Sequence, residues 1–304
     1  MNGDAEERAA EFEGLRPRLF AIAYRMLGSA SEAEDAVQDA YLRWNAADTS
    51  AIEVPAAWLT TVLTNLCLTR LTSARATREH YVGAWLPEPV LTGTPAAGGP
   101  GIGPLETAEQ RESVSLALLS LMERLTPAER AVFVLREAFA YPHSDIAGIL
   151  GITPEASRQL YRRGRQRVAE DRRRFEPSER RWHDVVEKFL DAARGGDIAA
   201  LEALLAEDAV SWSDGGGKVR AARHPVHGRQ RVARLLAGIA GQATRDHTIG
   251  LAEVNGVPAI LVLLDGEPAA VLAPEVVDGR VAAIRSTVNP DKLAFLARQL
   301  RSEG

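Results

Sequence analysis

The stretch that decides the fold is Leu125–Val168, LTPAERAVFVLREAFAYPHSDIAGILGITPEASRQLYRRGRQRV. Thr126 and Glu129 stand three residues apart before an apolar run, and this spacing predicts a capping box that opens a first helix. A second short helix is predicted over 145–150, and Gly151 ends it. A new cap and a third helix follow at once. Two helices joined by a tight glycine turn predict a helix-turn-helix.

The third helix of this stretch is strongly basic, with a thin apolar stripe. Arginine forms paired hydrogen bonds with guanine and with phosphate, and the first turns of a recognition helix meet base edges. The helix therefore predicts DNA binding, with an ordinary solvated basic helix as the alternative. The residues predicted to read bases are Glu155, Ser157, Arg158, Gln159 and Arg162.

Length and composition predict two or three globular domains, since the chain has 304 residues and 46% of them are hydrophobic. A single cysteine, Cys67, excludes a disulfide framework and a cysteine-rich zinc site. Cys67 lies among leucines, so we expect a buried thiol. The acidic N-terminus lacks the apolar core of a signal peptide, and no apolar run reaches about 18 residues. We therefore expect a cytoplasmic protein with no membrane contact.

Charge is unevenly spread along the chain. Residues 1–112 carry a net charge of −7, residues 113–181 carry +4, and residues 182–304 carry −2. The basic part coincides with the predicted helix-turn-helix, as binding to phosphate requires. The acidic first part predicts a protein partner with a basic surface.

The N-terminal part predicts three amphipathic helices, over 8–27, 32–45 and 55–73. The second helix has an acidic face that includes Asp35 and Asp39. Early acidic residues suit the helix dipole, which is the simpler explanation for Asp35 but explains less at Asp39. The third helix carries Thr61 and Asn65 four residues apart on one polar face.

These stretches together resemble a known family. SEAEDAVQDAYLRW (31–44), AWLTTVLTNLCLTRL (57–71) and the helix-turn-helix stand in the order found in extracytoplasmic-function (ECF) sigma factors of bacterial RNA polymerase. The resemblance implies two all-α domains. These are a region 2 helical bundle over residues 1–80 and a region 4 helix-turn-helix over residues 113–178, which together direct core RNA polymerase to promoters.

The resemblance also implies roles for residues. Region 2 would bind the polymerase and flip a base out of the −10 element, at a cost of a few kcal/mol that pocket contacts repay. Family members often carry an aromatic residue in the loop over 48–53, and this chain has none there. The implied polymerase-binding residues are Asp35, Gln38, Asp39 and Arg43; those for the −10 element are Trp58, Thr61 and Asn65; those for the −35 element are Ser157, Arg158, Gln159, Arg162, Arg163 and Arg165.

Residues 81–112 are predicted to form a linker between the two domains. Glycine and proline supply 11 of the 22 residues over 83–104, which disfavours helix and central strand. The linker begins with the sequence WLPEP. We expect Trp85 to dock onto another part of the chain, the alternative being a ring that lies on its own neighbours.

The chain continues well past the end of an ordinary ECF sigma factor. Residues 182–304 predict helices, then strands, with a hairpin signal at Asp278-Gly279. This order resembles the SnoaL-like α+β cone, with a curved antiparallel sheet. The predicted helices are 182–194, 198–205, 228–240 and 291–301, and the predicted strands are 208–214, 219–223, 247–254, 259–265, 269–277 and 281–288.

Three motifs resemble those of an ECF subgroup with a fused SnoaL-like domain. We expect them to form one intramolecular contact between this domain and the sigma domains, which regulates the factor in place of a separate anti-sigma protein. The motifs are Trp85, Leu86, Pro87, Glu88 and Pro89; Asp214, Gly215, Gly216, Gly217 and Lys218; and Asn289, Pro290, Asp291, Lys292 and Leu293.

A cone of this type encloses a pocket, so a ligand sensor or an isomerase-like enzyme is the alternative. Such chemistry needs a carboxylate base and an acidic donor such as tyrosine. Asp214 could be the base, with Trp212, His224 and His227 near the pocket mouth. No tyrosine follows Tyr161, and fold alone transfers no activity. We therefore expect no catalytic residue, no metal site and no cofactor.

Overall fold

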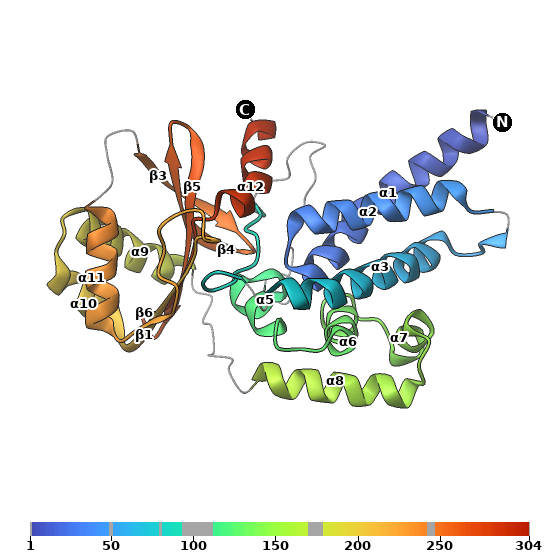
Figure 1. Ribbon diagram of the computed structural model, residues 1–304, viewed down its shortest axis with the longest axis horizontal. Coiled ribbons are helices and arrows are strands. Elements are labelled where there is room, and N and C mark those ends of the chain that lie inside the picture. The colour runs from blue at the N-terminus through green and yellow to red at the C-terminus, as the bar shows by residue number, and fades with distance from the viewer. Residues whose placement is uncertain are drawn as a thin grey trace. The chain divides into compact units, whose positions relative to one another are not determined.

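The structure is a computed structural model that describes residues 2–48, 51–78, 81–92, 112–169, 179–241 and 247–303. The chain divides into two compact units (Figure 1). The first comprises residues 1–80, 90–172 and 299–304, and the second comprises residues 81–89 and 173–298. Most of the Gly/Pro-rich linker (93–111) and of the charged tail (170–178) lies outside the described residues.

The first unit opens with a bundle of three helices, α1 (Asn2–Leu27), α2 (Ala30–Ala46) and α3 (Pro55–Arg78), which all contact one another. The Ser29 side chain caps α2 by accepting from the Glu32 N–H at 3.1 Å. Trp44 is buried, and its indole N–H donates to the Arg8 carbonyl at 3.1 Å. The bundle confirms the three predicted helices, with α3 longer than expected.

The same unit contains α5 (Leu116–Met122), α6 (Pro127–Glu137), α7 (His143–Leu150) and α8 (Pro154–Ala169). The capping box at Thr126 and Glu129 is present, and Gly151 adopts φ 64 at the end of α7, where a side chain would be strained. Buried Glu129 also accepts from Arg167 at 2.5 Å, which ties α6 to α8. The predicted helix-turn-helix, α7 and α8, is therefore confirmed.

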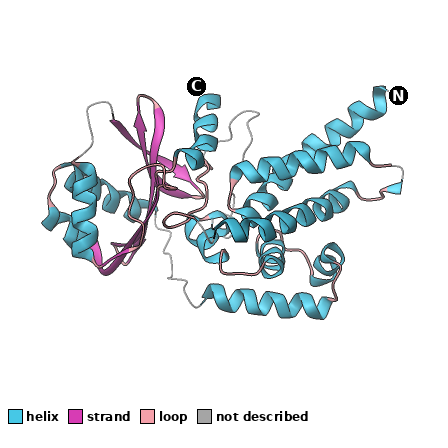
Figure 2. Ribbon diagram, viewed as in Figure 1, coloured by secondary structure: helices cyan, strands magenta, loops and turns pink. Residues whose placement is uncertain are grey.

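The second unit is a six-stranded sheet with helices packed on one face. The strands are drawn in magenta in Figure 2. The helices are α9 (Glu179–Arg194), α10 (Ile198–Leu204), α11 (Arg229–Ala240) and α12 (Pro290–Glu303), of which the residues from 299 onward are grouped with the first unit. Those on that face pack Trp182, Phe189 and Val232 against Ile260 and Ile284 of the sheet. The strands, in sheet order, are β2 (Val226–His227), β1 (Leu205–Asp214), β6 (Arg280–Thr287), β5 (Glu267–Val277), β4 (Val257–Leu264) and β3 (His247–Val254).

Tight turns connect the four consecutive strands β3 to β6. Asn255-Gly256, Asp265-Gly266 and Asp278-Gly279 each have positive φ at both residues. These are the residue pairs that two-residue hairpins favour. The turns fix the antiparallel register, in which Val254 pairs with Val257 and Val277 with Arg280.

Two features of the sheet differ from the expectation. Residues 219–223 were predicted as a strand, but they form an irregular segment after a turn, and the short β2 follows it. The alternation of apolar residues there is too short to outweigh the preceding glycines. In addition, β1 pairs parallel to β6, so the sheet is antiparallel everywhere except at this pair.

Candidate functional site

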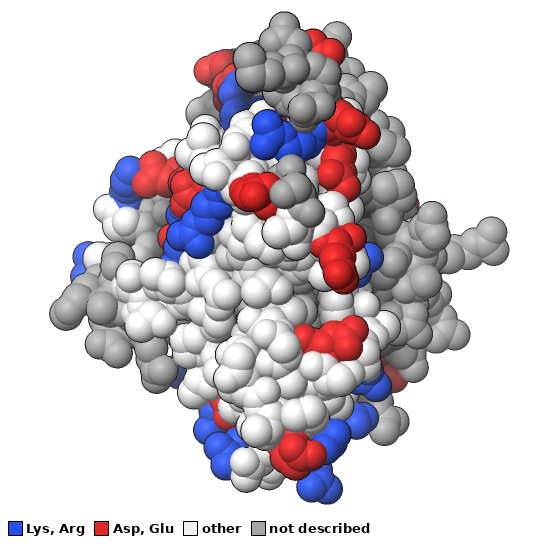
Figure 3. Space-filling view, turned by 90° about the vertical axis from the view of Figure 1, so that its right-hand side faces the viewer, with Lys and Arg blue, Asp and Glu red and all other residues white. Residues whose placement is uncertain are grey.

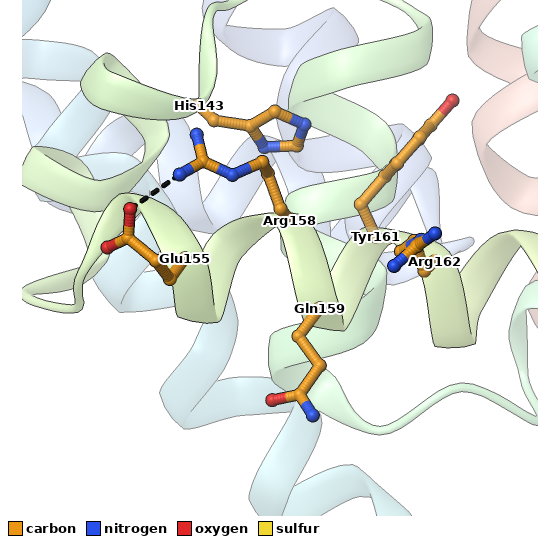
Figure 4. Close-up of a pocket in the computed structure, with 6 residues that line it drawn as sticks. All are labelled: His143, Glu155, Arg158, Gln159, Tyr161 and Arg162. Atoms are coloured by element: carbon orange, nitrogen blue, oxygen red, sulfur yellow. Dashed lines mark hydrogen bonds and ion pairs between the residues drawn. The ribbon is translucent and has the colours of Figure 1, made fainter.

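The exposed face of α8 carries most of the side chains predicted to read DNA. Arg158, Gln159 and Arg162 are exposed and line a shallow hollow of about 430 Å³ together with His143 and Tyr161 (Figure 4). Arg163 and Arg165 are exposed further along the helix. The hollow combines guanidinium, amide and ring groups, which are groups that bind base edges and phosphates.

An ion pair occupies part of this hollow in the free protein. Nη2 of Arg158 lies 2.5 Å from Oε1 of Glu155, one helical turn earlier (Figure 4). Both side chains are more than half exposed, so the pair is weak and can exchange for a contact with DNA. Glu155 therefore keeps the Arg158 side chain near the N-terminal end of α8 and leaves it exposed.

Ser157 is predicted to read DNA, but it does not lie on the exposed face of α8. The residue is completely buried, and its Oγ lies 2.9 Å from Nδ1 of His143, at the start of α7. Burial, with Arg136 and Arg158 adding to it, lowers the pKa of His143. Ser157 stands seven residues before Gly164 on the buried face of α8. This spacing is the signal that could have identified it as a support of the helix.

The candidate polymerase-binding face lies on α2. Asp35, Gln38 and Arg43 are exposed, and Asp39 is half-buried, with its Oδ2 2.7 Å from Nη2 of Arg70 on α3. Figure 3 shows a broad uncharged area on this face of the molecule, with acidic and basic groups intermixed around it.

The residues predicted to bind the −10 element lie along α3. Asn65 is exposed, and Thr61 is half-buried and donates its hydroxyl to the Ala57 carbonyl at 2.9 Å. The Trp58 ring lies 5.7 Å from the Trp44 ring, so it is packed at one side and accessible at the other. The loop before α3 is described only in part, since residues 49–50 lie outside the described residues.

The three motifs meet within the second unit around one buried carboxylate. Asp214, at the end of β1, is completely buried. Its Oδ1 accepts from the Tyr81 hydroxyl at 2.5 Å and from the Gly216 N–H at 3.1 Å. Its Oδ2 accepts from the Leu86 N–H at 2.8 Å and from Nζ of Lys292 at 2.7 Å. We refer to Tyr81, Trp85, Leu86, Asp214, Asn289 and Lys292 as the Asp214 cluster.

Lys292 is the cation of this cluster. Its ammonium also donates to the Leu86 carbonyl, and it lies 4.1 Å from the Trp85 ring centre and 4.8 Å from that of Tyr81. Ammonium groups are stabilised over aromatic rings, most strongly where water is excluded. Lys292 is buried, so the carboxylate and the two rings together replace its hydration.

Backbone geometry makes the glycines of the second motif necessary. Gly216 has φ +59, and a Cβ there would stand 2.2 Å from Nδ2 of Asn289. Asn289 uses that amide to donate to the Tyr81 hydroxyl at 3.0 Å, and its Oδ1 accepts from the Asp291 N–H. Lys218 forms an exposed ion pair with Asp291 at 2.5 Å. Together with the hydrogen bond from Leu86 to Asp214, these contacts connect residues from all three motifs.

Tyr81 belongs to this cluster although no local sequence pattern indicates it. Burial, followed by the hydrogen bond to Asp214, raises the pKa of Tyr81 above its usual range. The phenol thus remains protonated and donates to the carboxylate. Its partner is 133 residues away in the chain, so no local pattern could have identified the pair.

Other expectations for the second unit concern ligands and metals. His224 and His227 are exposed, on the segment around β2. Within the described residues, no group of three or more His, Cys, Asp or Glu side chains is placed to hold a metal ion. None of the described helices is long and apolar enough to cross a membrane.

Comparison with known proteins places both helical domains in the sigma-70 class. Residues 12–77 match Sigma-70 region 2, and residues 115–168 match Sigma-70, region 4. The ECF RNA polymerase sigma factor SigJ of Mycobacterium tuberculosis is 38% identical over 296 residues, which cover 93% of this chain and 92% of SigJ. The probable ECF RNA polymerase sigma factor SigI of the same species is 32% identical, covering 96% of this chain and 97% of SigI.

A solved structure agrees with these matches. The crystal structure of the M. tuberculosis sigma factor SigJ superimposes with a TM-score of 0.74, at 35% identity, over 94% of this chain and 98% of the other. The chain belongs to the ECF RNA polymerase sigma factors. It combines sigma-70 regions 2 and 4 with a C-terminal domain of the NTF2/SnoaL-like fold.

Proposed function

We propose that this sigma factor reads −10 and −35 promoter elements with regions 2 and 4, and that its C-terminal domain regulates it in cis through the Asp214 cluster. The polymerase would bind the face of α2 that carries Asp35, Gln38, Asp39 and Arg43. Trp58, Thr61 and Asn65 would contact the −10 element. The exposed arginines of α8, with Gln159, would read the −35 element.

The observation that carries the regulatory part is the hydrogen bonding of Asp214. This side chain belongs to the C-terminal domain, yet it accepts from Tyr81 and from the backbone of Leu86, both in the linker that follows region 2. The linker joins region 2 to region 4 in the sequence. Fixing part of it to the C-terminal domain therefore restricts how the two promoter-reading regions can separate.

Tethering explains how a contact of modest strength can act as a regulator. The motifs belong to one chain, so each is present at the high effective concentration that a linker provides. A contact between separate proteins of the same intrinsic affinity would dissociate on dilution. A cis contact avoids this loss, and it opens when polymerase or another partner competes for either side.

We further propose that the C-terminal domain is not an enzyme. Both oxygens of Asp214 accept hydrogen bonds, and one also pairs with Lys292, so this carboxylate is poorly placed to take a proton from a substrate. A structural role accounts for its burial. A ligand-sensing pocket elsewhere in the domain stays an alternative, which a rise in thermal stability on ligand addition would support.

The experiment is promoter-directed transcription with reconstituted core polymerase and full-length protein. Trp85→Ala and Lys292→Met weaken the cluster from its two sides, and we expect each to raise transcription several-fold. Lys188→Met, on the exposed face of α9, is the matched control for loss of a lysine. Binding to core polymerase without a promoter separates assembly from promoter reading.

Unchanged transcription and unchanged solution scattering in both cluster variants would contradict the regulatory proposal. Failure of every variant and of the wild type to bind core polymerase would contradict the assignment of the polymerase-binding face. Complete removal of the C-terminal domain is a less direct test, since it removes every other contact of that domain together with the Asp214 cluster.

A further inference from the structure

A histidine that no sequence pattern indicates lies on the surface proposed to read the −35 element. His143 is the first residue of α7, and its half-buried ring lines the hollow beside Arg158 and Arg162 of α8. Figure 4 shows the ring on the same side of α8 as the Arg158 side chain. In a helix-turn-helix, the first helix crosses the DNA backbone while the second reads bases. His143 therefore belongs to the part of the motif that approaches phosphates.

Two neighbours hold the imidazole ring in one orientation. Nδ1 of His143 lies 2.9 Å from Oγ of Ser157, which is completely buried. The imidazole also meets the Tyr161 ring edge to face, with ring centres 5.6 Å apart and planes at 63°. Tyr161 is fixed in turn by a hydrogen bond to Glu137 of α6 and by stacking on Phe133. Because Nδ1 is used within the protein, Nε2 is the ring nitrogen that serves a ligand in the hollow.

The serine partner suits a ring that changes its charge. A hydroxyl both donates and accepts hydrogen bonds, whereas a carboxylate only accepts and an ammonium only donates. When the ring is neutral, Nδ1 accepts from Ser157 and the ring proton stands on Nε2. When the ring is charged, both nitrogens donate and the Ser157 oxygen accepts. The imidazole therefore gains a proton without losing this hydrogen bond, and Nε2 carries a hydrogen in both states.

Cations around His143 favour its neutral form in the absence of DNA. Burial, with Arg136 of α6 and Arg158 of α8 adding to it, lowers the pKa of His143. Arg162 lines the same hollow and brings further positive charge to it. Guanidinium groups form strong, charge-assisted hydrogen bonds with phosphate. The hollow therefore attracts a phosphate to the side of the imidazole.

Acidic groups on the surrounding helices already have partners. They are Glu155, which pairs with Arg158; Glu137, which accepts from Tyr161; and Asp145, which accepts from the Ser144 hydroxyl. α3 also packs on α7, and its described titratable side chains are Cys67, which is buried, and Arg70, which pairs with Asp39 of α2. With all these groups in place the pKa of His143 is still lowered. A further anion is therefore needed to favour the charged ring.

A DNA phosphate supplies that anion. An opposite charge within about 4–6 Å favours the charged form of a titratable group, so a phosphate in the hollow raises the pKa of His143. The ring then takes up a proton as the complex forms, and affinity rises as the pH falls through the pKa of the bound state. Below the pKa of the free protein the rise stops, because the ring is already charged before DNA binds.

We propose that His143 is a phosphate-contacting residue of region 4 that gains a proton when the −35 element binds, and that Ser157 is its positioning residue. The inference rests on the proposed function of α8 as the −35 reader and adds one contact to that surface. A phosphate contact carries no sequence information, but it fixes the register of the helix on the DNA. Promoter affinity then depends on pH in the range where histidine titrates.

Promoter binding by the holoenzyme, made from core polymerase and the full-length protein, tests the proposal. Affinity for a labelled promoter duplex is measured by fluorescence anisotropy between about pH 6 and pH 8 at fixed salt. We expect the affinity of the wild type to be several-fold higher at the acidic end. His143→Gln keeps an amide donor near the position of Nε2 but gains no charge. Its affinity should therefore match the wild type at the alkaline end and change much less with pH.

Matched variants separate this contact from general effects of pH. His224→Gln removes an exposed histidine of the C-terminal domain and should keep the pH dependence of the wild type. Ser157→Ala leaves the ring in place but loosens it, so the pH dependence should be reduced and not abolished. At the acidic end, the slope of log affinity against log salt should be smaller in His143→Gln by about 1, because one phosphate fewer is neutralised. Thermal unfolding confirms that each variant is folded.

Two results would overturn the proposal. One is equal affinity of the wild type at both ends of the pH range, and the other is an unchanged pH dependence in folded His143→Gln. Arg162→Ala distinguishes these failures from failure of the proposed function. If it lowers affinity while His143→Gln keeps the wild-type pH profile, α8 reads the DNA and His143 takes no part. If Arg162→Ala binds like the wild type at every pH, the −35 surface is wrongly assigned and the inference fails with it.

Discussion

Oδ2 of Asp214 lies 2.7 Å from Nζ of Lys292, and both side chains are buried. The two residues are 78 positions apart in the chain. Asp214 lies at the end of β1, and Lys292 lies near the start of α12. The Trp85 ring, the Tyr81 phenol and the Leu86 backbone, all from the linker, contact this ion pair. The pair thus connects the linker with the C-terminal domain.

Removing one member of the pair should destabilise the second unit. Asp214→Asn or Lys292→Met leaves a buried charge unpaired, which costs about 3–5 kcal/mol. The double variant should lose less than the sum of the two, because no charge stays unpaired. Urea unfolding of the four proteins measures the coupling. Additive losses would show that the two side chains act independently.

Gly216→Ala should disrupt the cluster through the backbone. The residue has φ +59, and an added Cβ would meet the side chain of Asn289 at 2.2 Å. We expect a loss of about 1–3 kcal/mol in unfolding free energy. Gly238→Ala is the control, since it lies in α11 with no atom within 4 Å, and it should stabilise by about 0.5–1 kcal/mol. Equal effects of the two substitutions would contradict this account.

Ser157 and Arg158 should behave differently although they are adjacent in α8. Ser157→Ala removes the hydrogen bond to His143 and should lower the stability of region 4 while leaving sequence preference intact. Arg158→Ala should leave stability unchanged and weaken binding to a −35 duplex by about 1–3 kcal/mol. Thermal unfolding and DNA titration at fixed salt separate the two. A change of base preference in Ser157→Ala would contradict this account, because it would mean that Ser157 reads bases.

Cys67 should be unreactive in the folded protein. Burial raises the pKa of its thiol to about 12, and the thiolate is the reactive form. Alkylation at pH 8 should therefore proceed only through opening of the α1–α3 bundle. Addition of denaturant should accelerate it to the rate of a free thiol. Rapid alkylation of the native protein would mean that α3 is less well packed than described.

Local signals in the sequence predicted most of the fold. The capping box at Thr126, the glycine turn at Gly151 and the Asp278-Gly279 hairpin each depend on neighbouring residues, and each is present. The same reasoning failed at 219–223, where a short alternating run follows three glycines. Asn255-Gly256 and Asp265-Gly266 are hairpin signals of the same kind as Asp278-Gly279, and both pairs have positive φ.

The sites were predictable only in part, because contacts between distant residues leave no local pattern. The three motifs were identified by resemblance, and the structure brings residues from each into one cluster. Tyr81, His143 and the contact of Tyr141 with Arg18 were missed. Tyr141 meets Arg18 across 123 residues, and nothing near either residue indicates the other.

The most direct test of the account is transcription from a cognate promoter by core polymerase with the wild type, Lys292→Met and the control Lys188→Met. The account predicts several-fold more transcript with Lys292→Met than with the other two, at equal binding to core polymerase. Equal transcript from all three proteins, with the Asp214 cluster shown to be disrupted by its loss of stability, would contradict regulation through this cluster.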